Sequence, residues 1–198
     1  LLPGGDEVEI LVVNDGSKDS TAEIADEYEK NYPGIVRAIH KENGGHGDAV
    51  MTGLRHATGL YFKVVDSDDW VSEDAVERIV SRIQETGCDI LYFDFVKEYA
   101  DRSKLKSESD YAAADRNLYI RNMYNHKAYG CVWNKCVRHS LYKDNVVHFP
   151  EYSYAEDTYL MSQLVGYSSS LAHLNASLYH YRKDNLQAIT KQNRKKRR

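Results

Sequence analysis

The sequence lacks the features that mark membrane-spanning, disulfide-rich and zinc-binding proteins. Its apolar runs stay well short of the roughly 18 residues that a membrane-spanning helix needs. The three cysteines, Cys88, Cys131 and Cys136, do not have the spacing of a metal-ligand set and cannot all pair with one another. We therefore expect reduced thiols in a cytoplasmic protein, in preference to a redox or zinc site.

An excess of charge of one sign is also missing. The net charge of -4 gives no general basis for binding nucleic acid, so we expect no nucleic-acid partner. Residues 191–198 are a local exception, because six of these eight residues are basic. This basic tail is consistent with peripheral contact at the inner, anionic face of a membrane, and also with a solvated chain end. The oligomeric state stays open.

What the sequence does have is the composition of a globular domain. Its 198 residues are 42% hydrophobic and 28% charged, which is enough apolar material for one sizeable core. Short apolar runs that are typical of strands alternate with helical patterns. The strands are expected at 8–13, 35–39, 60–65 and 90–96, and the helices at 20–31, 49–56 and 73–85. This alternation predicts an α/β fold with a mostly parallel sheet flanked by helices.

Local signals refine some of these elements. Ser20 and Glu23 form a capping-box pattern that predicts the start of the first helix. Residues 101–115 are polar and poorly periodic, which predicts a long loop or connecting segment. Beyond that segment we expect helices at 116–125 and 156–165 and a last apolar stretch at 171–181.

An acidic cluster follows the strand expected at 60–65. It consists of Asp66, Ser67, Asp68 and Asp69, and ligands of open parallel sheets bind beyond the carboxyl ends of the strands. A divalent cation would relieve the repulsion between these carboxylates, and their hard oxygen atoms suit Mg²⁺ or Mn²⁺. We expect Asp66 and Asp68 to face the ligands and Asp69 to support the turn. The alternative is an acidic helix N-terminus stabilised by the helix dipole.

Several motifs resemble those of family 2 glycosyltransferases. They are Val12–Thr21, Asn43–Gly47, Thr58–Gly59 and Asp66–Trp70, in this order. The resemblance implies a GT-A fold and transfer of a sugar, with inversion, from a nucleotide diphosphate sugar, usually a UDP-sugar. The acceptor would be a saccharide or a lipid-linked saccharide of cell-surface polysaccharide or glycolipid synthesis, and Mn²⁺ or Mg²⁺ the cofactor. A nucleotidyltransferase of related fold and a non-catalytic nucleotide-sugar-binding module remain alternatives.

The resemblance assigns the donor site to the first half of the chain. Asp15 would accept hydrogen bonds from the nucleotide base, although it could also form an Asx turn before the helix. Asn43 and Gly44 would lie near the base and ribose, or simply form a tight turn. Asp66, Ser67 and Asp68 would bind the metal ion and the diphosphate. We therefore divide the single domain, residues 1–198, into a nucleotide-sugar-binding half, an acceptor-side half and the tail, at 1–96, 97–190 and 191–198.

The second half of the chain carries the remaining candidates that the resemblance implies. Asp157 is the expected catalytic base and Glu156 the second choice. Alternatively, both residues only begin a helix, where the helix dipole favours acidic side chains. Trp133 could stack on a sugar or lie buried in the core. Arg182 could approach the diphosphate or lie on the surface. The three histidines of the first strands and helices do not form a metal-ligand set; these are His40, His46 and His56.

The family normally begins with one more strand and helix, which line the other side of the base pocket. The sequence given begins after this βα unit, so we expect an incomplete base pocket and an exposed sheet edge.

Overall fold

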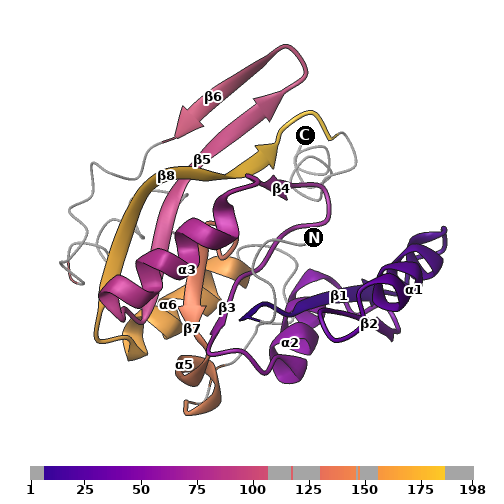
Figure 1. The fold of residues 1–198 in the computed structure, drawn as a ribbon, viewed down its shortest axis with the longest axis horizontal. Coiled ribbons are helices and arrows are strands. Elements are labelled where there is room, and N and C mark those ends of the chain that lie inside the picture. The colour runs from indigo at the N-terminus through magenta and orange to yellow at the C-terminus, as the bar shows by residue number, and fades with distance from the viewer. Residues whose placement is uncertain (1–6, 107–116, 118–129, 146, 148–155, 186–198) are drawn as a thin grey trace, which may run out of the picture.

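The computed structural model describes residues 7–106, 117, 130–145, 147 and 156–185. The first part of the chain forms a small parallel β-unit (Figure 1). Strand β1 (Ile10–Asp15) pairs with β2 (Val36–Lys41) in parallel, from Ile10 opposite Val36 to Asp15 opposite Lys41. Helix α1 (Thr21–Asn31) connects the two strands, and α2 (His46–His56) follows β2. This strand–helix–strand unit brings the ends of β1 and β2 together at one edge.

A six-stranded sheet forms the rest of the framework. Its strands run in the order β3 (Tyr61–Phe62), β7 (Lys135–Arg138), β5 (Ile90–Tyr99), β8 (Leu171–Arg182) and β4 (Trp70–Val71), with β6 (Arg102–Lys106) paired to β5. Only β5 and β8 are parallel in this sheet; the other four pairings are antiparallel. The prediction of a mostly parallel sheet is therefore wrong for the described strands. Short strands such as β4 and β7, and the tight β5–β6 turn, need no helical crossover and so pair antiparallel.

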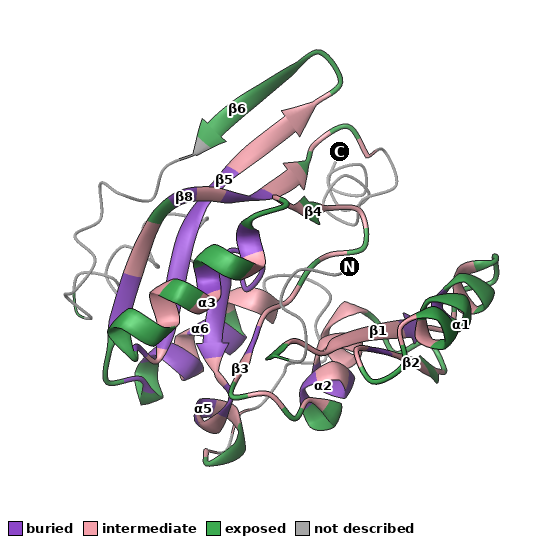
Figure 2. Cartoon of the chain, in the orientation of Figure 1, coloured by how far each residue is buried: buried purple, intermediate pink, exposed green. Residues whose placement is uncertain are grey.

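The core lies on both faces of β5. Ile90 and Tyr92 belong to a buried cluster with residues of α6 (Glu156–Tyr167), whereas Leu91 and Phe93 belong to a second cluster with residues of α3 (Ala75–Thr86). Successive strand residues point to opposite faces, so one helix covers each face, as Figure 1 shows. The buried residues are concentrated on β5 and on the sides of the helices that face it (Figure 2). A short helix, α5 (His139–Lys143), follows β7.

The structure confirms most of the predicted elements and corrects some of their ends. Ser20 occupies the N-cap of α1, but its side chain makes no capping hydrogen bond, so the capping box is wrong. The carboxylate of Asp19 accepts from the backbone N–H and hydroxyl of Thr21 instead. The segment expected as a long loop begins with strand β6 and thus forms a hairpin with β5. The expected strand 60–65 is regular only in β3.

Some predictions fall on parts of the chain that the structure does not describe. These are most of the helix expected at 116–125 and the whole basic tail, 191–198. Within the described residues, no helix has both the length and the apolar composition needed to cross a bilayer.

Candidate active site

The ends of β1 and β2 are joined by a hydrogen-bonded loop around Asp15. Its Oδ1 accepts from Lys41 Nζ at 2.6 Å and from the N–H of Gly44 at 2.8 Å, and its Oδ2 accepts from the N–H of Gly45 at 2.8 Å. Asn43 Nδ2 donates to the Asp15 carbonyl at 2.9 Å. The loop therefore gathers three predicted donor-site residues, Asp15, Asn43 and Gly44, in one place.

These contacts keep Asp15 ionised. Partial burial opposes the charged form, but the bonds from Lys41, Gly44 and Gly45 outweigh burial and hold the pKa of the Asp15 carboxyl below its ordinary value. Asp15 does not form the alternative Asx turn; its neighbour Asn14 makes the local side-chain bond instead, because the N–H of Ser17 donates to Asn14 Oδ1 at 3.0 Å. The carboxylate of Asp15 is thus directed across to the glycine-rich loop.

The acidic cluster lies between β3 and β4 and is fixed from β8. The hydroxyl of Tyr179 accepts from the N–H of Asp66 at 3.1 Å and donates to Asp69 Oδ2 at 2.7 Å. The N–H of Arg182 donates to Asp69 Oδ1 at 2.8 Å. Both oxygen atoms of Asp69 therefore accept hydrogen bonds from β8, as expected of a residue that supports the turn. Burial, reinforced by the charges of Asp66 and Asp68, raises the pKa of Asp69 to about 6.

The other two carboxylates of the cluster point in different directions. Asp66 Oδ1 lies 3.3 Å from His46 Nε2, and Asp68 Oδ2 accepts from Asn185 Nδ2 at 2.6 Å. Ser67 is exposed between them. This separation is compatible with the predicted division, in which Asp66 and Asp68 serve different ligand atoms.

The second acidic motif begins helix α6 and lies beside the first. Glu156 Oε1 is 3.3 Å from His46 Nδ1, so one imidazole ring contacts a carboxylate of each motif. The hydrogen bond to Asp66, and then the nearby carboxylate of Glu156, raise the pKa of His46 to about 10, so the ring is a cation at neutral pH. This role of His46 was not predicted. The one feature of the sequence that could have drawn attention to it is its place between two glycines at the expected start of a helix.

Asp157 is the most strongly perturbed acid of the second motif. Burial raises its pKa to about 6, and the charges of Asp66 and Glu156 add to this effect while His46 opposes it. Its Oδ1 is buried and has no hydrogen-bond partner among the described residues. A buried carboxylate oxygen without a partner is costly, which is typical of a group that awaits a ligand or a proton.

The Trp133 segment is part of the core. The indole of Trp133 is only 5% exposed and packs on the rings of Phe95, Tyr179 and Tyr181. Stacking of Trp133 on a sugar is therefore wrong, and the core alternative is correct. The neighbouring Lys135 is also buried, and its Nζ donates to the carbonyl of Cys131 and to Asn134 Oδ1 at 2.6 Å each.

Two further cations flank the acidic cluster. Arg182 reaches it through its backbone, while its guanidinium pairs with Asp184 at 2.8 Å. Lys63 lies beneath the cluster: its Nζ donates to the Trp133 carbonyl at 2.6 Å and lies 4.6 Å from the centre of the Tyr179 ring. Burial lowers the pKa of Lys63 to about 7. Lys63 was not predicted, although a lysine inside the apolar run 60–65 was a visible signal.

Two groups of side chains are candidate ligands of a divalent cation, and the spacing of the ligand atoms supports the second of them. Asp66 and Asp68 supply the carboxylate oxygens that Mg²⁺ and Mn²⁺ prefer. His46, Glu156 and Asp157 form a second set, whose ligand atoms lie within 4.8 Å of one another. The unpartnered Oδ1 of Asp157 belongs to the second set. The surface or core role expected for His46 is thus wrong, whereas His40 pairs with Asp26 and His56 bonds to the Thr52 carbonyl, away from this site.

Comparison with known proteins defines the class to which this site belongs. A family model described as glycosyl transferase family 2 matches residues 4–147, which is more than half of the chain. The chain belongs to glycosyl transferase family 2. The resemblance read from the motifs is thus confirmed, and with it the GT-A fold, an α/β fold with a sheet flanked by helices.

Particular relatives show how much of such proteins the chain covers. The putative glycosyltransferase EpsH of Bacillus subtilis is 32% identical over 184 residues, which is 89% of this chain and 53% of EpsH. Glycosyltransferase GlyA of Streptococcus pneumoniae is 32% identical over 185 residues, or 88% of this chain and 26% of GlyA. The crystal structure of S. aureus TarS 1-349 with UDP-GlcNAc matches with a TM-score of 0.77 at 25% identity, over 90% of this chain and 50% of TarS 1-349. The chain therefore spans about half or less of these proteins.

Proposed function

We propose that the chain is the catalytic domain of a metal-dependent, inverting glycosyltransferase. It takes a sugar from a nucleotide diphosphate sugar, in our proposal a UDP-sugar, and transfers it to a saccharide or lipid-linked acceptor of cell-surface polysaccharide synthesis. The observation that supports this most directly is the contact of His46 with both Asp66 and Glu156, because it joins the two acidic motifs in one site. The complex of TarS with UDP-GlcNAc supports the choice of donor.

The donor half of the site is formed by the two loops described above. Asp15 stays ionised and can accept from a base N–H, with Asn43 and Gly44 beside the ribose. Asp66 and Asp68 would hold the metal ion, with Ser67 at the diphosphate end of the donor and Arg182 nearby. When bound, Mn²⁺ or Mg²⁺ neutralises the charge that develops on the leaving nucleotide diphosphate. In this proposal Asp69 fixes the loop through its bonds to Tyr179 and Arg182.

Asp157 is the proposed catalytic base. It removes the proton of the acceptor hydroxyl while that oxygen attacks the anomeric carbon opposite the leaving diphosphate, which inverts the configuration. A pKa of about 6 suits this task, because the group is ionised at neutral pH and still basic enough to take a proton. Such a base typically contributes about 10²–10⁴-fold to the rate. Glu156 is held by the His46 cation, which lowers its pKa and makes it the weaker base.

The proposal is tested by measuring release of nucleoside diphosphate from a panel of UDP-sugars, with Mn²⁺ and with EDTA. Asp68→Ala should lose metal-dependent binding of UDP. Asp157→Asn should retain UDP binding and lose transfer by about 10²-fold or more. A matched control is Asp144→Asn, which removes one exposed carboxylate after α5. If Asp157→Asn transfers sugar at the rate of the unmodified chain, the base assignment is wrong.

A further inference from the structure

A row of side chains crosses four strands of the larger sheet on one face. Trp70 of β4 lies opposite His180 of β8, and His180 lies opposite Val96 of β5. Val96 in turn lies opposite Leu105 of β6. Residues opposite each other in neighbouring strands point to the same side, so these four form one row, here called the cross-strand row. Figure 1 shows the four strands side by side, and three strand spacings make the row about 14 Å long.

Both ends of the cross-strand row are exposed. Trp70 is 45% exposed and Leu105 is 60% exposed. Val96 and His180, which lie between them, are only partly buried. Contiguous apolar side chains that face water commonly mark a surface where a ligand or a partner binds. The cross-strand row is therefore a candidate binding surface.

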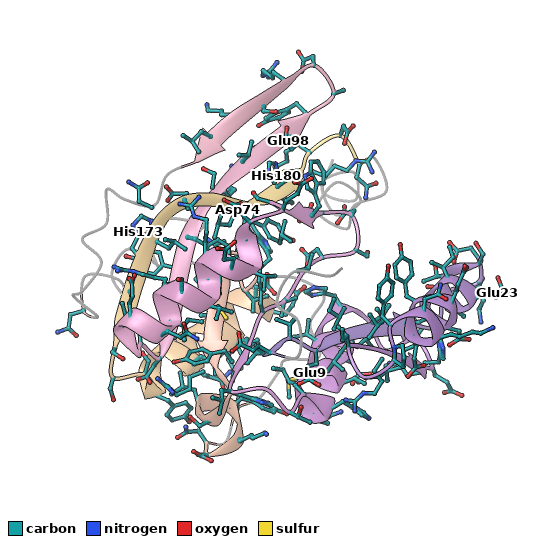
Figure 3. The ribbon with its side chains drawn as sticks, viewed as in Figure 1. Glu9, Glu23, Asp74, Glu98, His173 and His180 are labelled. Carbon is teal, nitrogen blue, oxygen red and sulfur yellow. The ribbon has the colours of Figure 1, made fainter. Side chains whose placement is uncertain are left out.

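The indole of Trp70 is held from one side. It stacks on the imidazole of His180, with the ring centres 5.2 Å apart and the ring planes 8° from parallel. The imidazole is itself fixed, because Nδ1 lies 2.8 Å from Glu98 Oε1 and Nε2 lies 3.3 Å from Ser72 Oγ; Figure 3 shows Glu98 and His180 close together. Since His180 covers one face of the indole, the exposed surface of Trp70 is the other face and the ring edges.

A row of polar side chains runs beside the cross-strand row. Arg182 of β8 lies opposite Glu98 of β5, and Glu98 lies opposite Ser103 of β6. Each of these three is two positions from a member of the cross-strand row, so it points to the same face of the sheet; together they are called the polar row. Guanidinium, carboxylate and hydroxyl groups supply both donors and acceptors. The face thus combines an apolar floor with a hydrogen-bonding border.

The cross-strand row begins at the acidic cluster. Trp70 follows Asp69 directly in the sequence. The N–H of Asp69 donates to the carbonyl of Asp66 at 3.1 Å, so residues 66–69 form a β-turn, and the Cα atom of Trp70 lies within about 11 Å of that of Asp66. A short chain of sugar units can therefore extend from the proposed transfer site onto the row.

From this arrangement we propose that the cross-strand row binds the acceptor as an oligosaccharide, with Trp70 stacked on a sugar unit close to the transfer site. The inference rests on the proposed function, and it specifies an acceptor of several sugar units. A pyranose ring has an apolar C–H face and a border of hydroxyl groups. The open face of the indole matches the first, and the polar row matches the second.

Two other occupants fit the cross-strand row less well. A stable protein partner, including a second copy of the chain, needs an interface of about 800 Å² on each side, whereas only Trp70 and Leu105 of the row are exposed. A membrane surface favours cations beside the apolar side chains. The polar row instead contains the carboxylate of Glu98, and the guanidinium of Arg182 is already paired with Asp184.

The test measures binding of chitotriose, cellotriose and maltotriose by calorimetry, in EDTA and without a donor. At least one of them should bind the unmodified chain. Trp70→Leu should weaken that binding roughly 10-fold, because leucine is apolar but has no ring face. Trp70→Phe keeps a ring and should stay within about 3-fold. The matched control is Tyr28→Leu, since Tyr28 is 53% exposed and also stacks on a neighbouring ring; it should bind like the unmodified chain.

Fluorescence of the unmodified chain gives a second readout that needs no variant to fold. The sequence has two tryptophans, and Trp133 is only 5% exposed, so acrylamide quenches mainly Trp70. A bound trisaccharide should reduce this quenching. Trp70→Phe, in which only Trp133 emits, should show no such change. The proposal is overturned if none of the three sugars reduces the quenching, or if Tyr28→Leu loses as much affinity as Trp70→Leu.

Binding of UDP with Mn²⁺ reports the donor site separately. Trp70→Leu should retain it, and should raise the KM for an oligosaccharide acceptor with little change in kcat. Asp68→Ala should lose UDP binding and still bind the trisaccharide in EDTA, so failure of the proposed function is distinguishable from failure of this inference. If Trp70→Leu changes only self-association or binding to phosphatidylglycerol vesicles, the row serves a protein or a membrane and the proposal is overturned.

Discussion

Tyr179 donates its hydroxyl proton to Asp69 across 110 positions of the sequence. The same oxygen accepts from the N–H of Asp66, so one side chain of β8 fixes both ends of the acidic cluster. Neither bond uses a carboxylate that we assign to the metal ion. The order of the cluster therefore depends on packing of β8, where the Tyr179 ring lies between Trp133 and the ammonium group of Lys63.

Tyr179→Phe should separate this role from simple packing, because the ring remains and only the hydroxyl is lost. Asp69 then keeps a half-buried carboxylate with one donor fewer. We expect the free energy of unfolding to fall by about 1–3 kcal/mol, and Mn²⁺ to bind more weakly because Asp66 and Asp68 are less well ordered. Urea unfolding and Mn²⁺ titration measure the two effects. Tyr28→Phe on α1, where the ring is 53% exposed, is the control; the same losses there would refute the assignment.

Asp157→Asn should stabilise the protein while it removes transfer. The folded-state pKa of Asp157, about 6, lies above its ordinary value of 3.8. The folded state therefore binds the proton more tightly, and stability decreases as pH rises through the window from about 4 to about 6. Above that window the buried charge costs about 1–3 kcal/mol, which the amide avoids. Unfolding at pH 7.5 in EDTA should thus show a gain for the variant.

The pH dependence supplies the internal control for this prediction. At about pH 4 both Asp157 and its amide replacement are neutral, so the stability difference should largely disappear. A gain of the same size at both pH values would show that packing, rather than the charge of Asp157, sets the effect.

His46→Gln distinguishes the two sets of metal ligands. The His46 ring is a cation that contacts Asp66 and Glu156. If the metal ion binds at Asp66 and Asp68, as we propose, loss of this cation should tighten Mn²⁺ binding, by roughly 5-fold or more for one charge in a partly buried site. If His46, Glu156 and Asp157 hold the ion, binding should weaken. His40→Gln removes a histidine that pairs with Asp26 on the surface, and should leave Mn²⁺ affinity unchanged.

The local parts of the site could be predicted from the sequence, and the long-range parts could not. Asp15 is the last residue of a strand and Glu156 the first residue of a helix, and Asp66 follows the apolar run 60–65, so the residue pattern and the position along the chain indicate all three. His46 and Tyr179 act through contacts with residues far away in the chain, and no spacing encodes these contacts. The partly antiparallel sheet escaped prediction for a similar reason, because β4 has only two paired residues and carries almost no pattern.

Gly130→Ala should disturb the proposed catalytic base without touching it. A Cβ at position 130 would lie 2.9 Å from Thr158 Cβ and closer still to its hydroxyl, so the start of α6 must shift. Because Thr158 follows Asp157, we expect transfer to fall by about 10-fold or more, since small displacements of reacting groups cost much rate, while UDP binding with Mn²⁺ persists. Transfer assays and UDP calorimetry measure the two quantities.

Two further variants decide whether the Thr158 contact is the cause. Gly130→Ala/Thr158→Ala removes the hydroxyl, which is the nearest atom that the new Cβ would meet, and should recover part of the transfer rate. Gly166→Ala places a methyl group later in the same helix, where nothing lies within 4 Å. It should leave transfer unchanged and stabilise α6 by about 1 kcal/mol, because alanine favours the helix over glycine. If Gly130→Ala and Gly166→Ala lose transfer equally, any change in or beside α6 lowers the rate. The specific effect of Gly130 on the position of Asp157 would then be refuted.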